Sequence, residues 1–397
     1  MHEEIDQSAQ ENSAINYVIR VLDHPASVDS EQWNALLADQ ASAGPFMRHE
    51  YLLALHESGS ASSATGWTPQ FLCVEQNSTL IAACALYLKD HSYGEYVFDW
   101  AWADAYQRHG LRYYPKLLGA VPFTPVPGPR LLARDAHGRA ILLRAIEQIA
   151  TQAKLSSAHL LFMDEADRAA AEAAGWMLRT TVQFHWQQRE PEPYVDFTDF
   201  LANMQREKRK KIQQERRKVA DAGVRFTWLE GASISEEDWD YFYRCYSITY
   251  QAHRSTPYLS RDFFARMAST MPENWMMVLA SKNGARVAAS LIGIDRNHGT
   301  AFGRYWGATE HIPCLHFAAC YYEPLAWCIA NQMGRFEGGA QGEHKMARGL
   351  LPVQTWSAHW LAHPQFAQAV AEFLQREGAG MESYMDELNE RRPFKAS

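Results

Sequence analysis

The sequence comprises 397 residues, with a hydrophobic fraction of 47%, an aromatic fraction of 12% and a formal net charge of −8 at pH 7. This length exceeds that of a typical single core and suits a chain of two domains. The acidic balance argues against a protein that binds nucleic acid over its whole surface, so we expect no DNA partner, although a local basic patch is compatible with it.

The amino-terminal segment and the cysteines indicate a reducing, cytoplasmic setting. Residues 1–14 (MHEEIDQSAQENSA) are polar and acidic without the apolar core of a signal peptide, and we expect them to be mobile. No stretch approaches the roughly 18 apolar residues of a membrane-spanning helix. The cysteines form no C-x-x-C pair and have no histidine at zinc-finger spacing, which predicts free thiols and no bound metal.

One order of elements occurs twice along the chain. The segments FLCVEQNSTLIAACALYL (71–88) and MVLASKNGARVAASLIGI (277–294) align without a gap, each as two apolar runs joined by a polar turn. This pattern predicts a β-hairpin in each half of the chain. A helical stretch precedes each hairpin, and a strand rich in aromatic residues and glycine is expected after each. These helices are expected at 49–58 and 261–270, and these strands at 93–104 and 299–309.

A helix and a short strand complete each copy. They are expected at 138–154 and 159–164 in the first half, and at 316–333 and 335–339 in the second. We interpret the chain as a mixed α/β protein of two tandem units, covering 15–190 and 191–365. Pro191 and Pro193 interrupt regular structure at the junction. Residues 366–397 are predicted to form a C-terminal helical tail that packs back on one unit.

Residues 200–223 are predicted to form one amphipathic helix that ends at Gly223. Two interpretations of its positive charge stay open. The run is either a solvated face in which Glu and Lys side chains pair, or a surface for a polyanion such as tRNA. The cations of the second interpretation are Lys208, Arg209, Lys211 and Arg216.

Two further segments of the second half carry candidate site residues. GRYWGAT (303–309) ends a predicted strand with Arg304, Tyr305 and Trp306 and turns at Gly307 toward the next helix. His311 and His316 follow as candidate bases, which we rank below the next segment because an isolated histidine near apolar residues is more often structural.

The second of these segments is the glycine-rich run RFEGGAQGEHKMARG (335–349). It lacks the P-loop pattern, since no Ser or Thr follows Lys345. It is either a polar surface loop or a ligand-binding loop after a strand. In the second case Glu343 or His344 is a candidate base, Lys345 an electrophilic cation and Arg348 an anion clamp.

The order of hairpin, strand, helix, RFEGG and cationic loop resembles the acetyltransferase-like unit called GNAT. Its duplication around a basic helix resembles the FemABX group of aminoacyltransferases. EKRKKIQQERRKVADAGVRF (207–226) matches the basic residues, the isoleucine and the Gly-Val end of that group's KxRxxIrxAxKxGV motif. FEGG echoes its aromatic-Gly-Gly motif, and His344–Lys345 its Phe-Lys pair. The block GAQGEHKMARG (339–349) is similar to predicted FemAB-like N-acyltransferases, and the likeness covers most of residues 40–375.

This resemblance implies an enzyme that transfers an acyl or aminoacyl group from an activated donor to an amine of a small molecule or peptide, such as a cell-wall precursor. Aminoacyl-tRNA or acyl-CoA would be the co-substrate, with no tightly bound cofactor. QRHGLR (107–112) keeps part of the CoA pyrophosphate pattern but has Arg112 where a small residue belongs, so both donors stay open. The alternatives are a non-catalytic module that binds RNA or an anionic ligand, and an acetyl-CoA-dependent N-acetyltransferase. Nothing in the sequence specifies the oligomeric state.

The resemblance also implies roles for individual residues. The amine must lose a proton to a base, and the tetrahedral oxyanion needs a hydrogen-bond donor. The catalytic candidates are Glu337, Glu343, His344 and Lys345, of which Lys345 matches the family lysine. The substrate-binding candidates are Arg304, Tyr305, Trp306, Gly338, Gly339, Gln341 and Arg348.

Overall fold

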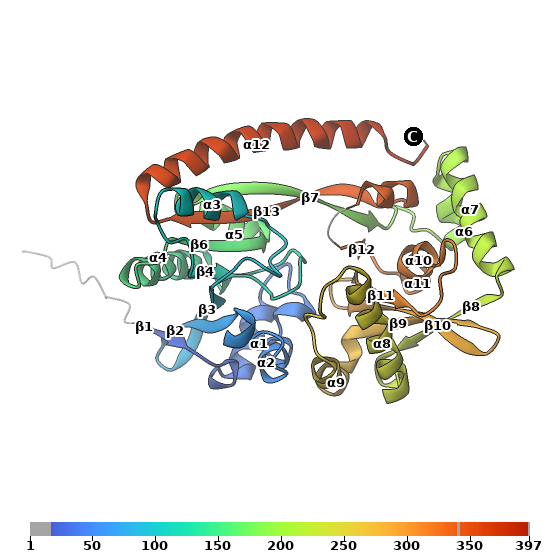
Figure 1. The fold of residues 1–397 in the computed structure, drawn as a ribbon, viewed down its shortest axis with the longest axis horizontal. Helices are drawn as coiled ribbons and strands as arrows, with labels where there is room; N and C mark the ends of the chain where they lie inside the picture. The colour runs from blue at the N-terminus through green and yellow to red at the C-terminus, as the bar shows by residue number, and fades with distance from the viewer. Residues whose placement is uncertain (1–16, 340–341, 396–397) are drawn as a thin grey trace, which may run out of the picture.

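The computed structural model describes residues 17–339 and 342–395, so the predicted mobile segment 1–14 lies outside the described residues. Helices pack on both faces of one large mixed β-sheet, and a long C-terminal helix lies along two of its central strands (Figure 1). The predicted mixed α/β fold class is therefore confirmed. No helix of the described chain is both long and apolar enough to cross a membrane.

The first half of the chain carries the elements β1 (Val18–Leu22), α1 (Ser30–Ala38), α2 (His49–Glu57), β2 (Thr68–Gln76), β3 (Thr79–Lys89), α3 (Trp100–Arg108), β4 (Lys116–Gly119), β5 (Leu132–Ala133), α4 (Ala136–Gln152), β6 (Ser157–Met163), α5 (Glu165–Ala173) and β7 (Met177–Gln187). The second half carries α6 (Phe197–Asn203), α7 (Arg206–Asp221), β8 (Val224–Glu230), α8 (Glu236–Ala252), α9 (Arg261–Thr270), β9 (Trp275–Lys282), β10 (Ala285–Asp295), β11 (Thr300–Ala308), α10 (Leu315–Phe317), α11 (Glu323–Ala330), β12 (Arg335–Glu337), β13 (Leu351–Leu361) and α12 (Pro364–Glu390). Both predicted hairpins, β2–β3 and β9–β10, are confirmed.

The strand order shows how the two halves combine. It runs β1-β2-β3-β4-β6-β13-β7-β12-β11-β10-β9-β8, with β5 paired to β3 off this path. Read from either edge the pattern is the same, and the parallel pairs β4–β6 and β11–β12 occupy equivalent places. β13 pairs with β6 of the first half, and β7 pairs with β12 of the second. Each half therefore contributes one strand to the sheet of the other.

The hairpin β2–β3 illustrates why apolar runs form central strands here. Ala83 and Ala85 point to the face covered by α1 and α2, whereas Ala82 and Cys84 point to the face covered by α4. Successive strand residues alternate between faces, so a strand covered on both sides needs apolar residues throughout. The apolar core between the sheet and helices α1 and α2 continues into α8 and α9, and this shared apolar packing joins the two halves.

The strand predicted at 93–104 is wrong. Gly94 and Tyr96 have positive φ, which breaks extended structure, and the helix α3 begins at Trp100. Trp102 and Tyr106 are buried one helical turn apart, so the aromatic residues lie on one helix face instead of alternating along a strand. β4 occupies the place in the sheet that this strand was expected to take.

The single helix predicted at 200–223 is two helices. α6 ends at Asn203, and Met204 adopts an extended conformation in an isolated bridge with Phe394 near the carboxyl terminus. α7 then begins at Arg206, and the backbone has positive φ at Gly223, as the predicted end requires. The break depends on a contact with a distant segment, which helical periodicity does not reveal.

The predicted C-terminal helical tail is confirmed as α12, which lies along β7 and β13 (Figure 1). Arg179 of β7 fastens it through paired hydrogen bonds of 2.8 Å to Glu377. Because β7 and β13 come from different halves of the chain, α12 covers the strands that the two halves exchange.

Candidate active site

A cavity of about 560 Å³ lies where the end of β11 meets the loop after β12. α8 closes one side with Tyr246 and Tyr250, and the first half of the chain adds Tyr96 and Pro125. The cavity therefore lies at the junction of both halves. It brings together the predicted site residues Arg304, Tyr305, Trp306, Gly338, Gly339, His344 and Lys345.

A β-bulge in β11 sets the position of Arg304. Leu291 of β10 pairs with Tyr305, while Ile292 pairs with Gly303, so Arg304 has no partner in the register. A bulge re-aims the side chain of its extra residue and is common beside ligand sites. Arg304 and Tyr305 both line the cavity as a result.

Gly307 lies inside β11 and not in the turn predicted there. A Cβ added at this position would stand 2.0 Å from the carbonyl oxygen of Cys245 on α8. The missing side chain thus lets α8 pack directly on the strand. This close approach is what brings Tyr246 and Tyr250 to the cavity wall.

Arg304 is held by neutral groups. Its Nη2 donates to the carbonyl oxygen of Phe123 at 3.0 Å and to the hydroxyl of Tyr305 at 3.1 Å. The guanidinium lies 5.3 Å from the ring centroid of Phe46 and 4.9 Å from that of Tyr305. Its Nε is buried and makes no hydrogen bond to any described residue.

Lys345 belongs to the 3₁₀ turn Glu343–Arg348, and its side chain is nearly enclosed, with 3% exposure for the residue. Its Nζ donates to the carbonyl oxygen of Gly339 at 2.9 Å. Burial lowers the pKa of Lys345 to about 8. The side chain is thus mostly an ammonium at neutral pH and can offer a strong hydrogen bond inside a partly dry cavity.

Two histidines line the cavity beside Lys345. His344 is exposed at the rim, and its Nε2 lies 3.2 Å from the hydroxyl of Tyr321. Partial burial and the nearby cations Arg348 and Lys345 lower its pKa. His316, which the sequence ranked below the loop residues, also lines the cavity, and burial lowers its pKa to about 4. Both rings are therefore neutral at pH 7, and the low pKa makes His316 a weak proton acceptor.

Glu337, a predicted catalytic residue, is not among the residues that line the cavity. It is 3% exposed, and its Oε1 lies 3.3 Å from Nε of Arg335 and 3.9 Å from Nδ1 of His185. Its Oε2 is buried without a hydrogen-bond partner among the described residues. Burial raises the pKa of Glu337 to about 7, against the opposing effects of Arg335 and Arg304.

This raised pKa predicts a pH-dependent effect on stability. A carboxyl with a higher pKa in the folded chain stabilises the fold below the unfolded pKa, near 4.5, and the contribution is lost as pH rises through about 7. Glu337→Gln should therefore raise the free energy of unfolding by about 1–3 kcal/mol at pH 8 and change it little at pH 4. Urea unfolding at both pH values measures this, with Glu172→Gln on the surface of α5 as the control. An equal effect at the two pH values would contradict it.

Two loop residues predicted to act on substrate have other partners. Glu343 is exposed and accepts a hydrogen bond of 2.7 Å from the hydroxyl of Tyr384 on α12. Arg348 is 3% exposed and donates from Nη2 to the carboxylate of Glu215 on α7 at 3.0 Å. Its guanidinium also lies 3.5 Å from the ring centroid of Phe317. Arg348 thus ties the loop to α7 outside the cavity, and the predicted binding residue Gln341 lies outside the described residues.

The basic helix α7 turns its cations outward. Ile212, Glu215 and Val219 face the interior. Lys211 and Arg216 are exposed, and Lys208 and Arg209 are half-buried. Glu215 forms an ion pair with Arg348, so α7, which carries this charged surface, is joined directly to the loop that carries Lys345.

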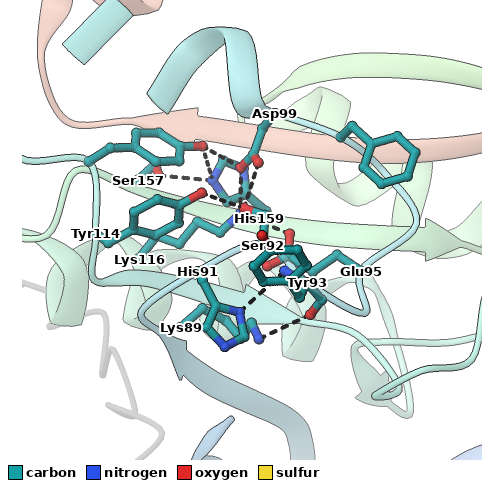
Figure 2. A network of polar contacts seen from close by, with 12 residues as sticks. Lys89, His91, Ser92, Tyr93, Glu95, Asp99, Tyr114, Lys116, Ser157 and His159 are labelled. Atoms are coloured by element: carbon teal, nitrogen blue, oxygen red, sulfur yellow. Dashed lines mark hydrogen bonds and ion pairs between the residues drawn. The ribbon is translucent and has the colours of Figure 1, made fainter. Parts of the chain in front are cut away.

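The first half of the chain contributes a group that no motif indicates. Lys116 of β4 is fully buried and donates to Glu95 at 2.8 Å, to Ser92 at 2.9 Å and to Asp99 (Figure 2). Glu95 directly precedes Tyr96, which lines the cavity and has a φ of 65°. The buried network therefore anchors the segment that carries Tyr96 to the site.

Residues 24–396 match the model of the FemAB-like family, described as peptidoglycan biosynthesis/recognition. No curated protein sequence matches the chain. Within the described residues, no cluster of at least three His, Cys, Asp or Glu side chains could hold a metal ion.

Several solved structures share the fold. The chain is 8% identical to FemX, covering 87% of this chain and 98% of that one, with a TM-score of 0.53. L-PGS from Bacillus licheniformis is 12% identical, with coverage of 87% and 97% and a TM-score of 0.52. The C-terminal domain of a predicted lysylphosphatidylglycerol synthetase from Agrobacterium fabrum is 12% identical, with coverage of 87% and 95% and a TM-score of 0.51. At these identities the likeness shows the fold alone.

Proposed function

The chain belongs to the FemAB-like family of acyltransferases, and from this premise we propose that it moves an acyl or aminoacyl group onto an amine held in the cavity between β11 and the 343–348 turn. The observation that carries the proposal is the position of Lys345, a buried ammonium on the wall of a substrate-sized cavity. The two-unit division at 15–190 and 191–365 is part of the same proposal.

The proposed reaction needs no covalent enzyme intermediate. The amine nitrogen attacks the carbonyl carbon of the activated donor, a C–N bond forms, and the donor's C–O or C–S bond breaks with its electron pair on the leaving oxygen or sulfur. The ammonium proton passes to neutral His344 and from there to water, because His344 is exposed at the rim. The second proton on nitrogen passes to the leaving group.

Lys345 acts on the tetrahedral intermediate in this scheme. Its ammonium donates to the oxyanion that develops on the donor's carbonyl oxygen, where a preorganised donor is worth most. Tyr305 and Trp306, with Tyr246 of α8, form an aromatic wall that positions the apolar part of the substrates. Gly338 belongs to the tight backbone beside Lys345, since a Cβ there would stand 2.4 Å from Leu350.

For the donor we propose a polyanion, namely aminoacyl-tRNA. The support is the outward cationic face of α7 and its ion pair to the loop that carries Lys345. The CoA-like pattern of the sequence offers no equivalent support, because Gln107 lies on α3 and is not among the residues that line this cavity.

Charge reversal on α7 tests the donor. Lys208→Glu combined with Lys211→Glu should raise KM for aminoacyl-tRNA at least about tenfold and flatten the dependence of KM on salt, because each phosphate contact contributes to that slope. Amide formation is measured by mass spectrometry at two salt concentrations. Arg134→Glu with Lys154→Glu, an exposed pair in the first half, is the matched control. An equal rise in KM with an acyl-CoA donor, or unchanged KM with tRNA, contradicts the assignment.

A further inference from the structure

The charges around the cavity restrict the acceptor. We propose that the acceptor is an amine that also carries an anionic group, as an amino acid or a peptide carboxyl end does, and that this group binds at Arg304. The inference rests on the proposed function, since it names the acceptor class for the same cavity.

The first support is the positive charge of the side chains that line the cavity. Its ionisable residues include the cations Arg304 and Lys345 and the histidines His253, His316 and His344. Among the described residues that line it, none is Asp or Glu. A simple alkylammonium would enter a cavity of its own sign without a counter-charge, which is unfavourable in a partly desolvated site. An amine with a carboxylate on the same molecule is neutral overall.

The second support is the unsatisfied guanidinium of Arg304. Within the described residues, only its Nη2 donates hydrogen bonds, and both acceptors are uncharged oxygens. No described carboxylate forms an ion pair with it within 4.0 Å, although the Glu337 carboxyl, which does not line the cavity, is close enough for Arg304 to lower its pKa, and the Arg304 Nε is buried without a hydrogen-bond partner. Buried charges in proteins are normally paired. A planar guanidinium with unused donors suits a carboxylate.

The third support is that the same cations assist the acceptor's chemistry. The nucleophile must be a neutral amine, and nearby positive charge favours loss of the ammonium proton. An acceptor with its anionic group at Arg304 has its amine in the same cavity as Lys345 and the histidines. Its apolar portion then contacts Tyr246, Tyr250 and Trp306.

Binding of matched probes, without any donor, tests the proposal. The pairs are L-phenylalanine and L-phenylalaninamide, L-leucine and L-leucinamide, and L-lysine and 1,5-diaminopentane, with sodium acetate and inorganic phosphate as anions alone. Calorimetry and thermal shift should show that the acid binds at least about tenfold more tightly than its amidated or decarboxylated partner, which lacks the carboxylate, in at least one pair. In Arg304→Met this ratio should fall close to one.

Two further variants make the result specific. Arg304→Lys keeps the positive charge but loses the planar pair of guanidinium donors, so the ratio should fall only in part. This variant also tests the proposal if Arg304→Met does not fold. Arg244→Met, an exposed arginine on the neighbouring α8, should keep the wild-type ratio. The proposal is overturned if no pair favours the acid, if the preference survives in Arg304→Met, or if acetate or phosphate alone accounts for binding.

These outcomes are separate from those of the proposed function. Probe binding requires no transfer, so a chain that prefers the acids yet forms no amide supports the acceptor site and contradicts the transferase. A chain that acylates amines equally well with and without a carboxylate supports the transferase and contradicts the acceptor site.

Discussion

Lys345→Met should lower kcat/KM for amide formation by about 10²–10³-fold, the effect of removing one oxyanion donor. Methionine replaces the aliphatic part of a side chain that is 3% exposed and removes only the ammonium that contacts Gly339. The fold should persist, because a buried cation with a lowered pKa contributes little to stability at neutral pH. Amide formation at saturating and limiting acceptor, with circular dichroism as a check of folding, measures the effect.

The pH profile gives an independent test of the same assignment. Lys345 must be protonated to donate, so its contribution should be lost as pH rises through about 8. Lys345→Arg should keep part of the activity and move this loss to higher pH. Lys282→Met, in the β9–β10 hairpin, is the matched control and should keep wild-type turnover. Wild-type turnover by folded Lys345→Met would remove Lys345 from the mechanism.

Lys116→Met should lower the free energy of unfolding by about 3–5 kcal/mol, the typical cost of removing one partner from a buried ion pair. Lys116 is 0% exposed, and its Nζ lies between the carboxylates of Glu95 and Asp99 (Figure 2). Without it, both carboxylates stay buried without their cation. Urea unfolding at pH 7 measures the loss, and Arg134→Met on the surface is the control.

A triple variant separates charge from packing. Lys116→Met with Glu95→Gln and Asp99→Asn removes all three charges together, and should recover most of the lost stability because buried groups of no net charge cost less. In Lys116→Met, KM for the acceptor should also rise, because Glu95 anchors the segment that carries Tyr96 to the cavity. A loss of stability below about 1 kcal/mol in Lys116→Met would show that the network is not required.

Much of the local structure could be predicted because it depends on neighbouring residues. The alternation of apolar residues and the turns at Asn77 and Asn283 were sufficient to predict the hairpins β2–β3 and β9–β10. Helical spacing predicted α4 and α12. The Gly-rich run next to a strand favoured a ligand-binding loop, since residues after a strand end lie at the edge of a sheet, and Lys345 and His344 of this run line a cavity.

Pairing between distant segments could not be predicted in the same way. The sequence pattern indicates neither β7 nor β13, which exchange between the two halves and pair over residues Met177–His185 and Leu351–His359. Arg348 was expected to bind substrate. In the structure it forms an ion pair with Glu215, which is far away in the sequence. A charged residue pairs with the partner that the fold places beside it, and the sequence around that residue does not predict which partner this is.

The sequence by itself determined the two hairpins, the mixed α/β class and the position of Lys345 in a loop, because periodicity and turn chemistry act within one segment. Only the tertiary structure decided which groups share the cavity. Tyr96 of the first half lines the same cavity as Arg304 and Lys345 of the second half. Glu337, Glu343 and Arg348, which were predicted to belong to the site, are not among the residues that line this cavity. The physical reason is that strand exchange and buried ion pairs join residues far apart in the chain, and these contacts form only when the whole sheet is assembled.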